Sequence, residues 1–339
     1  MKICIISTTV IVCPPKGYSG LEMITYLQAT GLANKGHKVL LIAPIGSSVP
    51  NNVELHGTTL FESEKQAYSG YWHRLPDYDV IIDSSWEKWS YILKMENKLK
   101  APILGVCHAP VHTMYKVPPP VPHPCIIAIS KDQAQGVKEA WNIEAKVAYN
   151  GVDTNFYKSS GQTRNDRYLF LARMSIIKGP HIAVEIAKKC NVGLDLVGDD
   201  KITGEPEYAA QIKAQAIGEV IYRGEATREK AVEFFSTRKA LFHTAQQFRE
   251  PFGLSPVEAQ LCGMPVITFD NGAMRETVKH GETGFVVKTQ EEFENIVKNK
   301  SCDNLSRKKC REWANQFSVT NMVDRYEELA KEALETGGW

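Results

Sequence analysis

Two glutamates in one short segment raise the first chemical question of this sequence. Glu250 and Glu258 are separated by seven residues within FREPFGLSPVEAQLCGMPVITFD, where a turn containing Pro and Gly precedes a predicted short helix. Their spacing does not fit the three- or four-residue step of a surface ion-pair ladder. Glu250 would lie before the helix and Glu258 in its first turns, so the two carboxylates would point into different parts of one pocket.

The predicted helix start offers a second kind of chemistry beside the carboxylates. Its first backbone N–H groups, around Gly253 and Leu254, have no partner within a helix and could bind a phosphate. Ser255-Pro256-Val257-Glu258 also matches a capping box with proline at the first helical position. Capping is therefore a purely structural alternative for Glu258, whereas Glu250 has no comparable structural explanation.

Two cations occur in ARMSIIKG, directly after the predicted strand 168–172. Arg173 and Lys178 would project from the loop at the carboxyl end of that strand, where ligands bind in open α/β sheets. Arginine forms forked hydrogen bonds to phosphate and lysine acts as a point charge, so the pair could neutralise a diphosphate. The alternative is ordinary solvated loop charge.

A glycine-containing loop and a histidine follow strands in the first half of the chain. In PPKGYSGLEM, Gly17 and Gly20 precede a helix predicted from Leu21, and glycine lets backbone approach a ligand closely. The alternative is a simple tight turn. His108 closes the strand PILGVCH, and its alternative is a packed or hydrogen-bonded histidine. The prolines of VHTMYKVPPPVPHP prevent nearby histidines from sharing a helix, so no metal site is expected.

Composition excludes some classes of protein. The 339 residues carry 40 Lys+Arg against 39 Asp+Glu, which argues against a nucleic-acid partner. Apolar runs stay below the ~18 residues of a membrane span. The eight cysteines include no C-x-x-C pair, so we expect a reducing, cytoplasmic location. The segment 86–100, WEKWSYILKMENKLK, predicts a packed helix with a solvated lysine face, or else a weak contact with an anionic membrane surface.

Short apolar runs recur along both halves of the chain and predict buried parallel strands. Six occur in the first half (2–7, 38–43, 79–83, 102–107, 125–129 and 146–149) and six in the second (168–172, 193–197, 219–222, 240–243, 265–269 and 284–287). Because predicted helices alternate with them, we expect an α/β fold with two doubly wound Rossmann-like domains facing across a cleft.

The predicted domains are an N-terminal acceptor-side domain at 1–155, a nucleotide-sugar-binding domain at 156–317 and a C-terminal helix at 318–339. The boundary lies in the polar, Gly-containing segment 150–167, NGVDTNFYKSSGQTRNDR. The last helix carries an apolar stripe of Val319, Met322, Val323, Tyr326 and Leu329 that needs an apolar partner.

Together these residues resemble the retaining glycosyltransferases of family 4, which have the two-domain GT-B fold. The matching motifs, in chain order, are P-P-x-G-Y-x-G-L-E (14–22), G-H-K-V (36–39), A-I-S-K (128–131), Y-N-G-V-D (149–153), A-R-M…K-G (172–179), L-V-G-D (196–199), Glu-x7-Glu (250–258) and F-S-V-T…R-Y (317–326). The resemblance also implies that the final helix crosses back onto the first domain.

The resemblance implies a role for each residue around the diphosphate and the sugar. Gly20 would bring its amide to the diphosphate, and Arg173 and Lys178 would bind the diphosphate and stabilise the departing nucleoside diphosphate. Glu250 would face the donor sugar. Backbone amides offered to sugar or phosphate would come from Phe252, Gly253 and Leu254.

The remaining implied contacts concern the nucleoside and the acceptor. Glu258 would accept hydrogen bonds from the ribose hydroxyls, and Ile221–Arg223 would flank the base. His108 would lie beside the sugar near the acceptor. This chain has Ser19 where the family more usually has glycine, so the loop requires a negative φ at that residue.

The implied activity is transfer of a hexose, with retention, from a nucleoside-diphosphate sugar to an acceptor hydroxyl on a sugar, a lipid-linked sugar or a small molecule. No metal or other cofactor is expected, because the cations and helix-start amides can stabilise the leaving diphosphate. Two alternatives stay open: a nucleotide-sugar 2-epimerase of the same fold, and a non-catalytic nucleotide-sugar-binding subunit.

Overall fold

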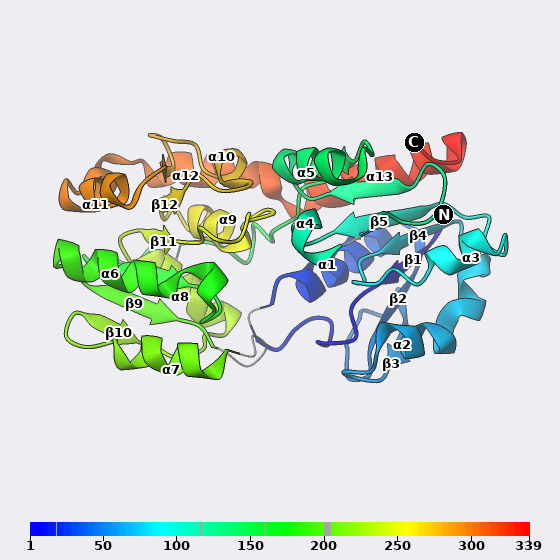
Figure 1. Cartoon of the computed structure of the whole chain (residues 1–339), viewed down its shortest axis with the longest axis horizontal. Helices are drawn as coiled ribbons and strands as arrows, with labels where there is room; N and C mark the ends of the chain where they lie inside the picture. Colours follow the sequence, from blue (N-terminus) through cyan, green and yellow to red (C-terminus); the bar gives the residue numbers. More distant parts are fainter. Residues whose placement is uncertain (18, 116, 160, 200–204) are drawn as a thin grey trace. The chain divides into compact units, whose positions relative to one another are not determined.

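The protein divides into two compact units in a computed structural model. The structure describes residues 1–17, 19–115, 117–159, 161–199 and 205–339. Unit 1 comprises Met1–Gly151 and Val319–Trp339, and unit 2 comprises Val152–Ser318. Figure 1 labels the helices and strands of both units.

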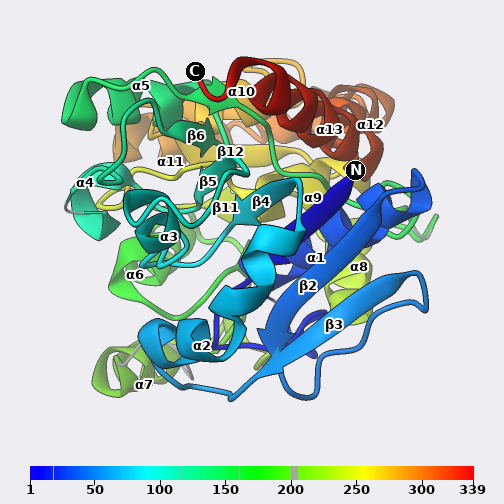
Figure 2. The same ribbon diagram turned by 90° about the vertical axis from the view of Figure 1, so that its right-hand side faces the viewer.

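Unit 1 is built on a seven-stranded sheet with the order β3-β2-β1-β4-β5-β6-β7, and its paired strands are all parallel (Figure 2). Its strands are β1 (Lys2–Ile6), β2 (Lys38–Pro44), β3 (Val53–Thr58), β4 (Val80–Asp83), β5 (Ile103–Cys107), β6 (Cys125–Ala128) and β7 (Lys146–Val147). Because all paired strands are parallel, the loops that follow them leave the same edge of the sheet, called here the carboxyl edge. The strand order reverses at β1.

The edge strand β3 was not predicted from the sequence. The expectation of six strands in this half of the chain is therefore wrong by one. In VELHGT only Val53 and Thr58 are buried, because an edge strand has a neighbour on one side alone. A search for apolar runs cannot find such a strand, since its pattern is mostly polar.

The helices of unit 1 are α1 (Leu21–Asn34), α2 (Glu64–Tyr71), η1 (Trp72–Asp77), α3 (Tyr91–Met95), α4 (Val111–Met114), α5 (Lys131–Trp141) and α13 (Val319–Thr336). The predicted helix at 86–100 is wrong in extent, because only α3 forms there. Lys88 has a left-handed backbone (φ 52°), and its side chain is buried rather than solvated. An amphipathic surface helix over this whole segment is thereby ruled out.

Unit 2 contains a six-stranded sheet with the order β10-β9-β8-β11-β12-β13, in which the paired strands are again all parallel. Its strands are β8 (Tyr168–Leu171), β9 (Leu194–Val197), β10 (Val220–Tyr222), β11 (Leu241–His243), β12 (Val266–Phe269) and β13 (Gly284–Val287). Its helices are η2 (Ile176–Lys178), α6 (Pro180–Cys190), α7 (Pro206–Ala214), α8 (Arg228–Thr237), α9 (Leu254–Leu261), α10 (Met274–Thr277), α11 (Gln290–Lys298), η3 (Ser301–Asn304), α12 (Arg307–Ala314) and η4 (Asn315–Phe317). The six strands predicted for this half are all present.

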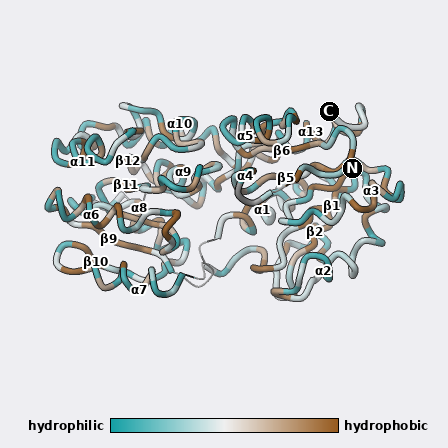
Figure 3. The backbone as a smooth tube through the Cα atoms, viewed as in Figure 1, coloured by the Kyte–Doolittle hydropathy of each residue, from teal (hydrophilic) through white to brown (hydrophobic). Residues whose placement is uncertain are grey.

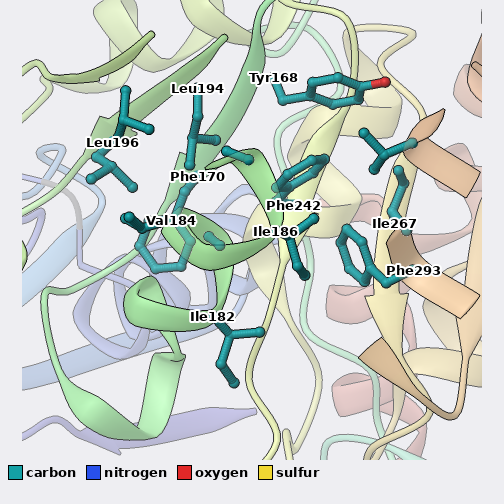
Figure 4. Close-up of a cluster of buried hydrophobic side chains, with 14 of the residues drawn as sticks. Tyr168, Phe170, Ile182, Val184, Ile186, Leu194, Leu196, Phe242, Ile267 and Phe293 are labelled. Carbon is teal, nitrogen blue, oxygen red and sulfur yellow. The ribbon is translucent and has the colours of Figure 1, made fainter. Parts of the chain in front are cut away.

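The core of unit 2 lies between its sheet and the helices that pack on it. Phe170, Phe242 and Phe293 meet side chains of α6 in one buried cluster (Figure 4). The predicted stripe of α6, Ile182, Ala183, Ile186 and Ala187, is buried there, while Glu185 on the opposite side is exposed. In Figure 3 hydrophobic colouring runs along the strands of unit 2, whereas its helices alternate between hydrophilic and hydrophobic colouring.

The C-terminal helix α13 completes unit 1 by packing on α1. Of its predicted apolar stripe, Met322, Val323, Tyr326 and Leu329 are buried and Val319 is half-buried. Lys35 pairs with Asp324 at 2.6 Å across the two helices. Among the residues that the structure describes, no helix is both long enough and apolar enough to cross a membrane.

The contact between α1 and α13 depends on a residue without a side chain. A Cβ at Gly31 would lie 2.3 Å from Cγ2 of Val323. We expect Gly31→Ala to lower the free energy of unfolding by about 1–3 kcal/mol through overpacking. Gly70 in α2 is the matched control, because a Cβ there meets nothing within 4 Å. Gly70→Ala should instead stabilise by about 0.5–1 kcal/mol through helix propensity.

Urea unfolding followed by circular dichroism measures both variants. Equal effects of the two substitutions would contradict a close approach of α1 and α13 at Gly31. Val323→Ala in the Gly31→Ala background provides the second check, since it removes the clashing methyl groups and should recover part of the loss.

Candidate functional site

The predicted site residues fall into the two units as follows. Unit 2 carries Arg173, Lys178, Arg223, Glu250, Phe252, Gly253, Leu254 and Glu258, whereas unit 1 carries Gly20 and His108. Within unit 2, the loops after β8 and β11 leave the carboxyl edge side by side, because these strands are neighbours at the centre of the sheet. Sheet order thus brings together residues that are far apart in the chain.

Lys178 and Glu250 form a direct ion pair in unit 2. The Nζ of Lys178 lies 2.5 Å from Oε2 of Glu250, and the two side chains are 16% and 9% exposed. The ammonium also lies 5.0 Å from the centre of the Phe248 ring. Two of the predicted catalytic residues are therefore brought into contact, in a largely buried setting.

Two glycines fix the loops that carry this pair. Gly179, directly after Lys178, has φ 69°, and a Cβ there would lie 2.3 Å from the carbonyl oxygen of Thr244. Gly272 has φ 62°, and a Cβ there would lie 2.2 Å from the carbonyl oxygen of Glu250. Only glycine combines the left-handed conformation with such a close approach. At each position the backbone of one loop therefore packs directly against the backbone of the other segment.

His243 is a third member of the cluster that sequence reasoning missed. It ends β11, and its Nε2 lies 3.5 Å from the same Oε2 of Glu250. Burial alone would raise the pKa of Glu250, but the charge of Lys178 and the hydrogen bond from His243 outweigh it and hold that pKa well below its usual value. Glu250 is therefore an anion, and within the described residues no hydrogen bond reaches its other oxygen, Oε1.

Arg173 supplies a further positive charge after β8. Its side chain is exposed and forms no hydrogen bond or ion pair with any residue that the structure describes. Arg173, Lys178 and Glu250, on the loops after β8 and β11, together carry one more positive than negative charge, which suits an anionic ligand.

The start of α9 differs from the predicted capping box. The helix begins at Leu254, and its N-cap is Gly253 with φ 81° and no side-chain hydrogen bond. Ser255 therefore already lies inside the helix, and Pro256 is its third residue rather than its first. The capping interpretation of Glu258 is wrong. Phe252, just before the helix, is buried and packs edge-to-face on Phe317.

Glu258 instead belongs to a buried polar chain. The hydroxyl of Tyr157 is hydrogen-bonded to Glu258, and burial followed by the charge of this carboxylate raises the pKa of Tyr157 well above its usual value. Nε of Arg228 donates to the Tyr157 hydroxyl at 3.5 Å. Glu258 is 7% exposed, so these neighbours fix its orientation.

Arg223 lies in a different cluster. Its Nε contacts Oδ1 of Asp195 at 3.1 Å, beside Arg167 at 2.9 Å from the same oxygen, and Arg238 pairs with Oδ2. Asp195 is fully buried, so this cluster compensates an internal charge. The implied contact of Arg223 with a base stays a prediction.

In unit 1, Gly20 is the N-cap of α1 and has φ −84°. The hydroxyls of Thr8 and Ser19 donate to Oε1 and Oε2 of the buried Glu22 at 2.7 and 2.6 Å. Tyr18, part of the motif noted in the sequence, lies outside the described residues. The loop before α1 is thus anchored to the first turn of the helix by two hydroxyls.

His108 follows β5 at the carboxyl edge of unit 1. Its backbone N–H donates to the Tyr115 hydroxyl at 3.2 Å, and its Nε2 is buried with no partner among the described residues. Lys88 lies close by and donates three hydrogen bonds of 2.8–3.0 Å to the carbonyls of Asp83, Ser85 and Val106. Burial and then the Lys88 charge lower the pKa of His108 to about 3.

We expect His108 to stay neutral well below pH 6 in the folded protein. Because its folded pKa lies below the unfolded value of ~6.5, the unfolded chain takes up the proton first. The contribution of neutral His108 to stability is therefore complete above pH 6.5 and is lost as the pH falls from there toward 3. NMR titration of the ring, assigned with His108→Asn, measures the pKa directly.

Lys88→Met separates the two causes. Without the ammonium the pKa of His108 should rise but stay below the usual value, because burial is the larger cause. Titration of His108 near pH 6.5 in the unaltered protein would show that the ring is not buried as described.

Unit 2 is similar in sequence to known glycosyltransferases. Residues 153–317 match the family model for glycosyl transferases group 1. The D-inositol 3-phosphate glycosyltransferase of Acidothermus cellulolyticus is 28% identical over 160 residues, which cover 40% of this chain and 35% of that protein. The chain spans less than half of the length of the first curated relatives that it matches.

Solved structures match the whole chain. AviGT4, a glycosyltransferase involved in avilamycin A biosynthesis, is 21% identical, with a TM-score of 0.78 over 99% of this chain and 98% of that one. The Anabaena protein Alr3699/HepE, in complex with UDP and glucose, is 21% identical with a TM-score of 0.74 over 98% and 99% of the two chains. The predicted α/β fold with two doubly wound units is confirmed: the chain has two Rossmann-like, parallel-sheet units that match GT-B glycosyltransferase structures. Unit 2 matches the group 1 family model.

Proposed function

We propose that this protein is a retaining glycosyltransferase that moves a hexose from a nucleoside-diphosphate sugar to an acceptor hydroxyl without a metal ion. One observation carries the proposal. The buried Lys178–Glu250 pair lies at the carboxyl edge of the unit that matches group 1 glycosyltransferases, and the exposed Arg173 follows β8 at the same edge. The family 4 assignment is part of the same proposal.

Breaking the bond between sugar and phosphate places negative charge on the leaving diphosphate. Arg173 has a full set of guanidinium N–H groups for forked contacts with that group. Lys178 has three N–H donors, of which Glu250 occupies one. The amides at the start of α9, whose N-cap Gly253 offers no side-chain partner, supply further aligned dipoles. These groups together could stabilise the leaving group electrostatically.

The same step leaves positive charge at the anomeric carbon of the sugar. Glu250 is suited to it, because its low pKa keeps it ionised and its Oε1 is not hydrogen-bonded within the described residues. We assign it electrostatic stabilisation or binding of sugar hydroxyls rather than nucleophilic attack. Retention would then follow from attack on the face that the phosphate leaves, guided by the phosphate itself.

Other residues would complete the donor and acceptor contacts. Glu258, held by Tyr157, would accept hydrogen bonds from the ribose hydroxyls, and Arg223 would lie near the base. Gly20 and His108 of unit 1 would serve the diphosphate and the sugar near the acceptor. The Anabaena protein of similar fold was solved with UDP and glucose, so uridine nucleotides are the first donors to examine.

Product analysis tests the proposal. A thermal-shift screen with UDP, GDP and ADP and their sugars identifies the donor, and that donor is then incubated with a panel of acceptors. Free nucleoside diphosphate together with an α-linked glycoside from an α-linked donor supports retaining transfer. An isomerised donor sugar would show an epimerase, and binding without turnover would show a non-catalytic subunit. Full activity after chelation of divalent metals is expected.

We expect Lys178→Ala and Glu250→Ala each to lower kcat by about 100-fold or more, the scale of lost electrostatic stabilisation at a transition state. Lys189→Ala is the matched control. That lysine is exposed on α6 and pairs with Glu185, so its loss should leave the rate unchanged. Melting temperatures recorded in parallel separate lost activity from lost folding. Normal turnover by both site variants would refute the site assignment.

A further inference from the structure

His243 and Thr268 form a hydrogen-bonded pair behind Glu250. The two residues are directly opposite each other in the parallel strands β11 and β12. Nδ1 of His243 lies 3.0 Å from Oγ1 of Thr268. His243 is 7% exposed and Thr268 is fully buried. Neither residue type nor spacing indicated a role for them in the sequence, and both are too deeply buried to be surface polar groups.

The neighbours of the two ring nitrogens indicate which of them carries the hydrogen in the neutral ring. An ionised carboxylate only accepts hydrogen bonds, so the Nε2 that faces Glu250 must carry the hydrogen. In a neutral imidazole Nδ1 is then an acceptor, and the Thr268 hydroxyl is the donor that faces it. The proton of that hydroxyl has one other acceptor in reach, the carbonyl of Phe269 at 3.2 Å. The bond to His243 is the shorter of the two.

The inferred arrangement is a directional chain, in which the Thr268 hydroxyl donates to Nδ1 of His243 at 3.0 Å and Nε2–H of His243 faces Oε2 of Glu250 at 3.5 Å. Lys178 donates to the same Oε2 at 2.5 Å. Both contacts act on one oxygen, so they fix the rotation of the carboxylate. Oε1, which no described residue binds, is therefore kept free for a ligand.

We propose that His243, with Thr268 selecting its tautomer, is a positioning residue that holds Oε2 of Glu250 in place and turns Oε1 toward the donor sugar. The inference rests on the proposed function of this site and adds a specific residue to it. His243 does not touch the donor in this scheme. Its contribution is to keep the carboxylate oriented during the reaction.

Two substitutions distinguish orientation from simple packing. In His243→Gln the amide nitrogen can take the place of Nε2 and still donate to Glu250. In His243→Asn the amide reaches only the position of Nδ1, so the bond to Thr268 can form and the bond to Glu250 cannot. We expect His243→Gln to keep kcat within about threefold of the unaltered enzyme, and His243→Asn to lower it by at least about tenfold, the scale of one hydrogen bond to a charged group.

KM for the donor should change less than kcat in His243→Asn, because Arg173 and Lys178 still bind the diphosphate. Equal losses in the Gln and Asn variants would show that the residue only fills space, and would overturn the proposal. Melting temperatures of both variants accompany the rates, so that a folding defect is not counted as a catalytic one.

NMR supplies a test that needs no substrate. With ¹⁵N-labelled histidine, the His243 ring should show the tautomer protonated at Nε2, assigned by its absence in His243→Gln. Thr268→Val removes the hydroxyl with little change of shape, and should lower the share of that tautomer and reduce kcat. A ring protonated at Nδ1 in the unaltered protein would overturn the proposal.

The NMR tautomer and the transfer rate distinguish failure of the positioning role from failure of the proposed function. If the ring has the expected tautomer but no donor sugar is transferred, the proposed function fails while the hydrogen-bond chain stands. If transfer occurs and the tautomer or the Gln–Asn contrast is wrong, the function stands and the positioning role is rejected.

Discussion

A buried negative charge at Glu250 is the constraint on which the rest of unit 2 depends. Removing a carboxylate from water is expensive unless a cation and hydrogen bonds compensate it. Lys178 and His243 do so, and they can reach Glu250 only because β11 lies between β8 and β12 in the sheet. The left-handed glycines Gly179 and Gly272 then let the loops approach closely enough to close the pair. The ion pair therefore depends on all three features: the opposite charges, the strand order of the sheet and the left-handed backbone at the two glycines.

Unit 1 compensates a buried charge in a different way. Three backbone carbonyls near the ends of β4 and β5 accept hydrogen bonds from the Lys88 ammonium. In unit 2, by contrast, the buried ammonium of Lys178 is paired with a carboxylate, that of Glu250. The three carbonyls around Lys88 carry no net charge, so the positive charge of Lys88 still acts on its neighbour and, together with burial, keeps His108 neutral. A neutral ring can accept a hydrogen bond at Nε2, which a protonated one cannot. The two units thus offer opposite chemistry, an ionised acid in one and a neutral base in the other.

The sequence predicts the strands well because buried parallel strands are continuous apolar runs. The sequence does not predict β3, because the exposed side of this strand is polar. It also predicts a helix through Lys88, because residue type alone does not distinguish a buried lysine from a solvated one. Arg173, Lys178 and Glu250 could be chosen as site residues because each follows a predicted strand. His243 could not, since it ends a strand of apolar residues and its partner Thr268 is known only from the pairing of β11 with β12. Contacts across a sheet require the strand order, which one sequence does not contain.

The start of helix α9 lacks the side-chain cap that the sequence predicts, which changes the hydrogen bonds expected for its first amides. A capping box at Ser255 would have used the hydroxyl of that residue and the carboxylate of Glu258 to satisfy the first amides of the helix. The structure begins the helix at Leu254 after a glycine cap that offers no side-chain acceptor. A cap side chain therefore does not hold those amides, which lie at the positive end of the helix dipole, and Glu258 is oriented by Tyr157 instead. One short helix can therefore present donors at its start and an acceptor on its side, which are the two requirements of a ligand that carries both phosphate and hydroxyl groups.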